Sequence, residues 1–167
     1  IFEIFMLLPR LFLIILMVAI FGNNIYITMF VVAITIWPTN ARITRAQVST
    51  LRNRLFVKAY KSAGASDLNL LFTHILPNGI YPVIVNSTLQ MGRAIITEAG
   101  LSFLGLGDIN HISWGQILLI AQNQLTTWWL ALFPGLAICI IVLAFNFVGG
   151  GINYALNPRM REIYVEL

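Results

Sequence analysis

The chain has 167 residues, of which 59% are hydrophobic and only 10% are charged, and its mean hydropathy is +0.85. A soluble domain normally carries about 25% charged residues, and a chain of this length could not hide so much apolar surface in one core. The composition therefore argues against a soluble globular domain and predicts an integral membrane protein. The net charge of +4 does not indicate nucleic-acid binding, because the basic residues are not spread over a soluble face.

The first apolar stretch predicts a helical hairpin. Residues 11–41 contain no charged side chain, and as one helix they would be about 46 Å long, against a hydrocarbon core about 30 Å thick. A single strongly tilted span would also fit, but the sequence Gly-Asn-Asn at residues 22–24 is a turn signal. We therefore expect two spans, over about residues 1–21 and 25–45, with the turn between them.

The basic residues predict the orientation of the chain. Six of the ten Lys and Arg residues fall between Arg42 and Lys61, and such residues accumulate in cytoplasmic loops. For Arg42 and Arg45 this topogenic role is a sufficient explanation. The other four flank the stretch described next and could equally pair with acidic groups on a partner; they are Arg52, Arg54, Lys58 and Lys61.

The longest polar interval of the chain, residues 57–78, predicts a docking element. Small residues crowd around Gly64, which supplies a backbone conformation that a side chain would resist. Apolar residues then follow at helical spacing, at Leu68, Leu71, Phe72 and Ile75. Pro77 is expected to end one element and open the next. The pattern indicates a helix, a tight turn at Gly64, a short amphipathic helix and then a new span.

A third span is predicted over about residues 78–100, because residues 68–92 carry no Asp, Glu, Lys or Arg. Arg93 and Glu98 lie in its outer part, and ionisable groups at membrane depth are candidates for a transport pathway. A position near the outer interface, or pairing with other helices, would also explain them. Because the two residues are five apart, they are not expected to face each other on one helix.

An outer loop is expected over residues 105–127, which contain no Lys or Arg. Within it, residues 112–121 are a candidate short interfacial or re-entrant helix. Trp114 suits the headgroup layer of a membrane. His111 has no second ligand at metal spacing and is interpreted as a polar loop residue.

A fourth span is predicted over residues 128–148, with a kink at Pro134. The three glycines at residues 149–151 would allow a bend after it. Residues 157–167 are expected to return to the basic, cytoplasmic side as a tail. Cys139 is the single cysteine, so the chain forms no internal disulfide.

The stretch 57–78 resembles the cytoplasmic "EAA" loop of permease subunits in ABC-type importers. In that motif Glu-Ala-Ala is followed after three residues by Gly, and about a dozen residues later by Leu-Pro. At matching spacing the chain has Ala59, Gly64, Leu76 and Pro77. It departs at Lys58, where the family usually has Glu, and at Tyr60, where it usually has Ala.

Further stretches are similar to the dipeptide and oligopeptide branch of these permeases, so the resemblance covers essentially the whole chain. They are residues 64–67 (Gly-Ala-Ser-Asp), 74–78 (His-Ile-Leu-Pro-Asn), 101–107 (Leu-Ser-Phe-Leu-Gly-Leu-Gly), 113–115 (Ser-Trp-Gly) and 157–159 (Asn-Pro-Arg).

The resemblance implies an all-α membrane protein: a bundle of about four transmembrane helices with a cytoplasmic coupling loop. Residues 1–156 would form the transmembrane permease domain, with the coupling loop at about 52–77. The coupling residues implied are Lys58, Ala59, Gly64, Ala65, Ser66, Asp67, Leu68, Leu71, Phe72 and Pro77. The protein would cross the plasma membrane several times, with the coupling loop and the C-terminus in the cytoplasm.

The partners implied are a second permease subunit in a heterodimer, two ATPase subunits, an extracellular solute-binding protein and membrane lipid. ATP and Mg²⁺ would bind to the ATPase partner. The chain itself has no Gly-Lys-Ser/Thr phosphate loop and no catalytic pairing of Ser, His and carboxylate, so it is expected to bind no cofactor and not to be an enzyme. The cargo would be peptides or similar small solutes, although members of this branch also carry sugars and metal chelates.

Permeases of this family usually have about six spans, and four are expected here. Together with a start at Ile1 rather than Met, this suggests that the first spans are missing, either because the chain is an excerpt of a longer protein or because the permease is shortened. A non-transporting remnant or membrane scaffold is therefore the alternative function. A secondary transporter is disfavoured because it has no reason to keep an ATPase-docking helix.

Overall fold

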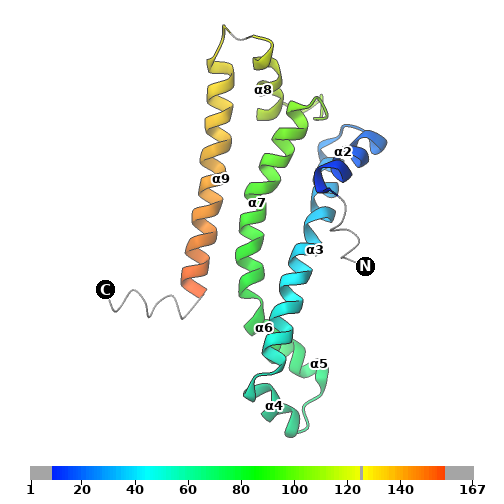
Figure 1. The fold of residues 1–167 in the computed structure, drawn as a ribbon, viewed down its shortest axis with the longest axis vertical. Coiled ribbons are helices and arrows are strands. Elements are labelled where there is room, and N and C mark those ends of the chain that lie inside the picture. Colours follow the sequence, from blue (N-terminus) through cyan, green and yellow to red (C-terminus); the bar gives the residue numbers. More distant parts are fainter. Residues whose placement is uncertain (1–8, 125, 157–167) are drawn as a thin grey trace, which may run out of the picture. The chain divides into compact units, whose positions relative to one another are not determined.

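The computed structural model describes residues 9–124 and 126–156, and every regular element among them is a helix (Figure 1). The helices are α2 (Arg10–Phe21), α3 (Ile25–Arg52), α4 (Leu55–Ser62), α5 (Asp67–Asn69), the π-helix η1 (Leu70–Ile75), α6 (Leu76–Gly79), α7 (Tyr81–Phe103), α8 (Trp114–Gln122) and α9 (Trp129–Leu156). The chain divides into two compact units, residues 1–38 with 89–147 and residues 39–88 with 148–167.

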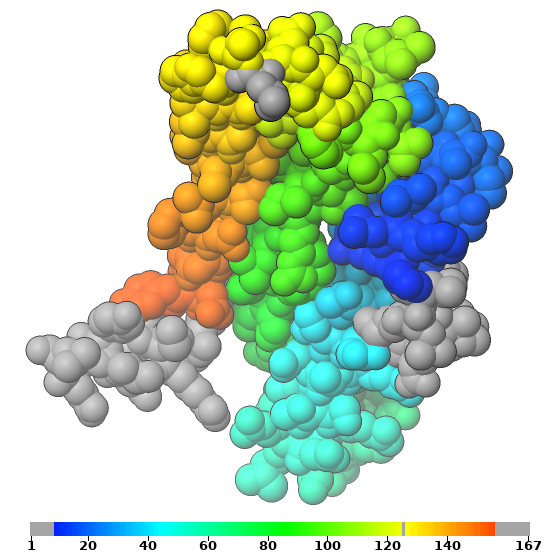
Figure 2. Space-filling view, turned by 45° about the horizontal axis from the view of Figure 1, so that its top comes forward, coloured from blue at the N-terminus to red at the C-terminus, as the bar shows by residue number. Residues whose placement is uncertain are grey.

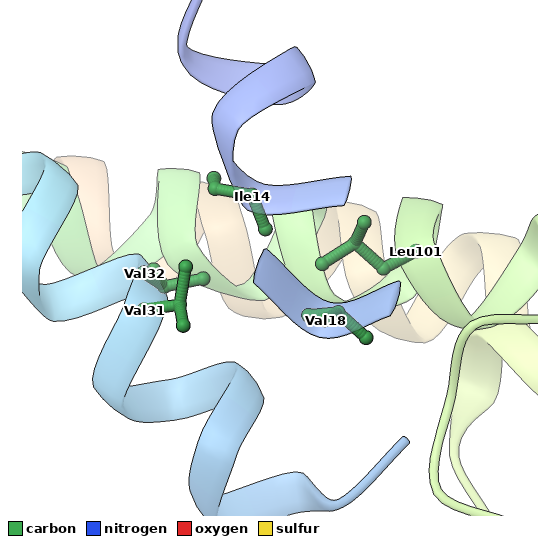
Figure 3. Close-up of a cluster of buried hydrophobic side chains, with 5 residues drawn as sticks. All are labelled: Ile14, Val18, Val31, Val32 and Leu101. Atoms are coloured by element: carbon green, nitrogen blue, oxygen red, sulfur yellow. The ribbon is translucent and has the colours of Figure 1, made fainter. Parts of the chain in front are cut away.

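The core of the first unit forms where α2, α3 and α7 pack together. Its buried side chains are Ile14 and Val18 from α2, Val31 and Val32 from α3, and Leu101 from α7 (Figure 3). On the face shown in Figure 2, α2 (blue) lies directly against the green segment that contains the end of α7. The hairpin turn predicted at residues 22–24 is present: Gly22 ends α2, and its N–H donates to the carbonyl of Val18 at 2.9 Å.

The second unit contains the loop between α3 and α7. Its core consists of Val57, Leu70 and Ile75, which are buried at the contact of α4 with η1. Polar contacts join α3 to α7 within this unit: the amide nitrogen of Asn86 donates to the Asn40 side chain at 2.6 Å. Hydrogen bonds of this kind hold helices together where water is scarce.

Within the described residues one helix, α9, is long and apolar enough to cross a membrane, over Trp129–Ala155. Only 6% of its apolar window is buried, whereas a core helix of a soluble protein would be mostly buried. The pair Asp67–Gly79 and Tyr81–Phe103 would qualify as one broken span with a bend of 52°. In the described residues α2 has only 12 residues, about 18 Å, while residues 1–8 of the expected first span lie outside them. The four-span bundle therefore stays a prediction.

The three glycines at residues 149–151 would allow a bend after the fourth span, but α9 continues through them to Leu156. Glycine is common in membrane helices, where an unsatisfied backbone would be costly. Pro134 lies inside the same helix, and the kink expected there stays a prediction.

As predicted, Pro77 stands where one element ends and the next begins: η1 ends at Ile75 and α6 begins at Leu76. Pro77 lies in the first turn of α6, where a residue without an N–H costs little. In the preceding π-turn the Leu76 N–H donates to the Leu71 carbonyl. A further break follows at Ile80, between α6 and α7, so α7 begins three residues later than the predicted third span.

Candidate functional site

The turn predicted at Gly64 is present. Gly64 has a φ of +88°, a left-handed conformation that a residue with a side chain rarely adopts. Its N–H donates to the Lys61 carbonyl, and the Ala65 N–H donates to the Tyr60 carbonyl, both at 3.1 Å. This pair of bonds is the Schellman ending of a helix, and it closes α4 immediately before the next helix starts.

α5 begins at Asp67, three residues after Gly64. The Ser66 hydroxyl oxygen accepts a hydrogen bond from the Asn69 N–H at 3.3 Å and caps the helix. Lys61 Nζ lies 3.0 Å from Asp67 Oδ1, so an ion pair bridges the turn. Both partners are exposed, and such pairs contribute at most about 1 kcal/mol. The turn is therefore held mainly by Gly64 and the two helix ends.

The loop has a small core of its own. Val57 on α4 packs against Leu70 and Ile75 on η1, and all three are at most 6% exposed. The rings of Tyr60 and His74 stack with their centres 4.0 Å apart. Burial of three aliphatic side chains stabilises by about 1.5–3 kcal/mol each. The loop can therefore move as one body.

Eight of the ten predicted coupling residues are exposed: Lys58, Ala59, Gly64, Ser66, Asp67, Leu68, Phe72 and Pro77. Ala65 and Leu71 are half-buried and pack against the small core instead of facing outward. Leu68 and Phe72, which are 71% and 62% exposed, lie four residues apart and so share one helical face. They form an apolar spot to which another protein could bind.

The structure places Glu98 and Arg93 at different hollows of the first unit. Glu98 Oε1 accepts a hydrogen bond from the Ser102 hydroxyl at 2.7 Å, and Glu98 lines a groove of about 580 Å³ between α3, α7 and α8. Arg93 lines a second hollow of about 470 Å³, together with Arg10. The prediction that Arg93 and Glu98 would not face each other agrees with this geometry.

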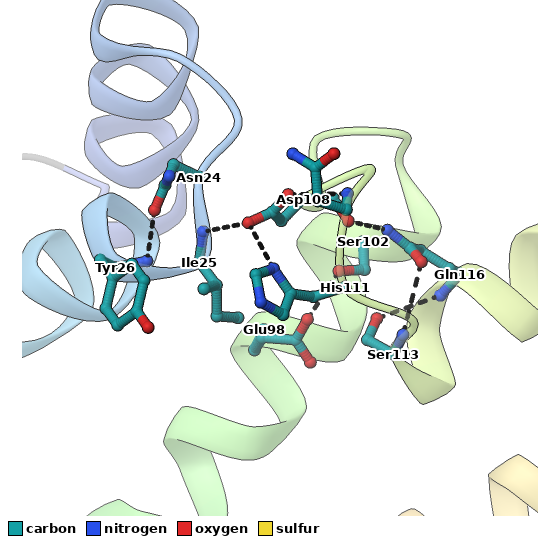
Figure 4. Close-up of polar contacts among 10 residues, drawn as sticks. Asn24, Ile25, Tyr26, Glu98, Ser102, Asp108, His111, Ser113 and Gln116 are labelled. Carbon is teal, nitrogen blue, oxygen red and sulfur yellow. Dashed lines mark hydrogen bonds and ion pairs between the residues drawn. The ribbon is translucent and has the colours of Figure 1, made fainter.

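Asp108 is a buried carboxylate that sequence reasoning missed (Figure 4). One oxygen accepts from the Asn110 N–H at 2.9 Å, and the other accepts from the Ile25 N–H at 3.1 Å and lies 2.9 Å from His111 Nδ1. The hydrogen bonds from Asn110 and Ile25, followed by the contact with His111, lower the pKa of Asp108 to about 2. Asp108 therefore ties the loop after α7 to the first turn of α3.

A partial signal for this cluster was present in the sequence. Asp108 and His111 are the only Asp, Glu, His, Lys or Arg residues in the stretch 99–156, and they are three residues apart. That spacing could have suggested the pair. The third partner, the backbone N–H of Ile25, lies 83 residues away from Asp108 in the sequence. No feature of the sequence indicated that these two residues would meet.

The short helix expected over residues 112–121 is α8. It starts with a capping box: the Ser113 hydroxyl accepts from the Gln116 N–H, and the Gln116 side chain accepts from the Ser113 N–H. The Gln116 amide nitrogen also donates to the Asp108 carbonyl. The helix start is thus bound to the same loop that holds Asp108 (Figure 4).

The first turn of α8 lies directly on α7. A Cβ atom added to Gly115 would overlap the Ala99 carbonyl oxygen and lie 2.7 Å from Ser102 Cβ. A Cβ atom on Gly107 would lie 2.9 Å from the same Ser102 atom. The stretches 101–107 and 113–115, noted separately in the sequence, therefore meet at Ser102.

Comparison with known proteins finds relatives along almost the whole chain. A family model described as "Binding-protein-dependent transport system inner membrane component" matches residues 1–162. The di/tripeptide transport system permease protein DppC of Pseudomonas aeruginosa is 40% identical over 162 residues, which are 96% of this chain and 54% of the relative. The dipeptide transport system permease protein DppC of Alkalihalophilus pseudofirmus is 38% identical over 164 residues, 97% of this chain and 54% of the relative.

A Brucella ovis protein, provisionally named a peptide permease, is 42% identical over 161 residues, 94% of this chain and 53% of the relative. The chain spans about half the length of the curated relatives it matches.

Proposed function

Because the chain belongs to the family of binding-protein-dependent transport system inner membrane components, we propose that it forms part of the translocation pathway of an ATP-driven importer. Relatives named as dipeptide and di/tripeptide permeases support peptides as the cargo. The observation that carries the proposal is the loop at residues 52–77, which has its own core and presents Leu68 and Phe72 to the outside.

We propose that this loop couples the permease to a separate ATPase. A loop that transmits the closure of a nucleotide-binding subunit must move as a rigid body. The Schellman turn at Gly64, the cap at Ser66 and the buried contact of α4 with η1 supply that rigidity. The exposed apolar spot supplies the contact, because partly exposed large side chains of this kind anchor protein interfaces.

The complete transporter would contain a second permease subunit, as a heterodimer, two ATPase subunits and an extracellular solute-binding protein. ATP and Mg²⁺ would bind to the ATPase, and this chain would catalyse no reaction. The basic segment between Arg42 and Lys61 supports a cytoplasmic position for the loop and, with it, for the tail at residues 157–167.

Within the membrane part, we propose Glu98 rather than Arg93 as the pathway residue. Glu98 faces a groove that is otherwise largely apolar and has no Lys or Arg in its lining. Arg93 is exposed and shares its hollow with another arginine. Intramembrane carboxylates of this kind commonly mark a substrate route.

The loop argues against the alternative function, a non-transporting remnant or scaffold. Such a protein would keep an ordered loop with an exposed apolar spot but would have no partner for it.

Crosslinking from the loop tests the proposal. Ala63 is exposed and lies beside the turn, in an ordinary backbone conformation, so Ala63→Cys leaves both Gly64 and the Ser66 cap intact. The background variant is Cys139→Ser, because Cys139 is exposed. The matched control is Ile109→Cys, which is 88% exposed in the loop expected on the opposite side of the membrane.

Recovery of an ATPase subunit crosslinked at residue 63, but not at residue 109, is the expected result. An intact complex that crosslinks at neither position would refute docking through this loop. A purified permease complex without any ATPase would refute the importer function itself.

A further inference from the structure

The loop unit contains a hollow of about 480 Å³ between the end of α3 and the helices of the loop. Its floor is aliphatic and includes the buried residues Val57, Leu70 and Ile75. Its ionisable residues are Arg52, Lys58, Lys61 and Asp67, and all four are exposed. The hollow therefore joins an apolar floor to a charged rim.

The rim has an excess of positive charge. Three cations and one carboxylate line the hollow, which leaves a net charge of +2. Lys61 is paired with Asp67 at 3.0 Å. Arg52 lies in the last turn of α3, where a cation complements the carbonyl end of the helix. The Lys58 side chain makes no hydrogen bond or ion pair within the described residues, and no helix end accounts for it.

We propose that this hollow binds an acidic segment of the ATPase partner, with Lys58 as its main charged contact. The inference rests on the proposed coupling function and adds the chemistry of the partner surface. Leu68 and Phe72 would supply the apolar part of the interface and the hollow its charged rim, which is the usual composition of protein interfaces.

The sign of the charge makes this contact selective. Lys58 stands where the family that the chain resembles usually has Glu. An ATPase whose surface is matched to Glu would place a cation opposite Lys58, and like charges facing each other weaken an interface strongly. Discrimination by an opposed charge is a common basis of partner specificity. The ATPase of this transporter is therefore expected to carry Asp or Glu at the contact.

An anionic lipid headgroup is the other source of negative charge near a cytoplasmic loop. Binding to a protein is favoured because the cations surround a hollow with a buried floor and lie on helices that also expose large apolar side chains. A polybasic surface that attracts lipid needs no such hollow. The experiment below separates the two.

The test measures the affinity of the ATPase for the tagged permease complex, stripped of its ATPase and reconstituted in nanodiscs. The variants are Lys58→Glu, Lys58→Gln and the matched control Arg54→Glu. Arg54 is exposed, lies four residues from Lys58 and does not line the hollow. Each variant is assayed with and without anionic lipid, at about 0.05 M and about 0.5 M salt, because salt screens exposed charges.

We expect Lys58→Glu to raise the Kd on the order of tenfold at low salt and Lys58→Gln on the order of threefold, with smaller effects at high salt. Arg54→Glu should change the Kd little. The result should be the same in both lipid compositions.

Four results would overturn the inference. Equal weakening by Lys58→Glu and Arg54→Glu would mean that only the total charge matters. Loss of the Lys58→Glu effect in nanodiscs without anionic lipid would assign the hollow to lipid. Equal affinity of wild type and Lys58→Glu for the ATPase would refute the Lys58 contact but would leave the proposed coupling function standing. Failure of the wild type to bind any ATPase would refute both the contact and the coupling function.

Discussion

Gly115→Ala should destabilise the protein, because α8 rests on α7 at this position. The new Cβ atom would lie 2.7 Å from Ser102 Cβ and would overlap the Ala99 carbonyl oxygen. Non-bonded carbon atoms normally pack at about 3.5–4.0 Å. Relief of the overlap therefore requires α8 to move by at least about 0.8 Å, since the backbone of α7 cannot rotate away.

The expected cost is that of an overpacked contact. Added methyl groups in a tight interior cost about 1–3 kcal/mol, and contact with a backbone atom places this site at the upper end. For a chain of this size, about 2 kcal/mol corresponds to a fall in Tm of roughly 4–8 °C. The movement of α8 would also strain the capping box and the Gln116 contact with the Asp108 loop.

The assay is thermal unfolding of the purified protein in detergent, with Gly100→Ala as the matched control. Gly100 also lies in a helix of this unit, but a Cβ atom there would meet nothing within 4 Å. Its replacement should be neutral or should stabilise by up to about 1 kcal/mol. If both variants unfold at the wild-type temperature, the close contact of α8 with α7 is wrong.

Two other predictions concern the turn and the buried carboxylate. Gly64→Val should uncouple ATP hydrolysis from transport or prevent assembly while leaving membrane insertion intact, because a β-branched residue is strained at a φ of +88°. The control is Ala63→Val, at an ordinary φ of −80°. Normal uptake with normal substrate-dependent ATPase activity in Gly64→Val would contradict the prediction. The pKa of Asp108 is lowered from 3.8 to about 2, so its carboxylate contributes stability that is fully present above pH 3.8 and is lost as the pH falls towards 2. Asp108→Asn should therefore flatten the decline of Tm between about pH 4 and pH 2, and an unchanged slope would show that the hydrogen bonds to Asp108 do not hold the loop.

The charge at position 58 bears on the proposed coupling to an ATPase. A permease that presents Lys58 in place of a carboxylate would accept a different ATPase surface from permeases with Glu there. The chain would then be paired with its own ATPase by charge, while Leu68 and Phe72 supply apolar contact that does not depend on that charge.

The features that could be predicted from the sequence are those governed by neighbouring residues. The turn at Gly64 follows from small residues and from the positive φ that glycine allows. The start of α8 follows from the Ser113 and Gln116 pair, and the turn at residues 22–24 from Gly-Asn-Asn. In each case the decisive hydrogen bonds span only a few residues.

The effect of a residue that disfavours helix depends on the backbone around it. Pro77 lies in the first turn of α6, where a residue without an N–H is tolerated, so it opens this helix as predicted. Residues 149–151 lie towards the end of a long apolar helix, where opening the backbone would leave polar groups unpaired. The bend that these glycines would allow is therefore absent.

The sequence by itself determined the class of the protein, the family resemblance and the presence of a helical loop with a tight turn between two helices, because composition, charge and turn chemistry are local properties. Only the tertiary structure decided that Leu71 packs inward while Leu68 and Phe72 face outward, and that Asp108 holds the backbone of Ile25. Helical spacing shows that several apolar residues share one side of a helix. Which of them is covered depends on a segment distant in the chain, and that distant contact is fixed only by packing.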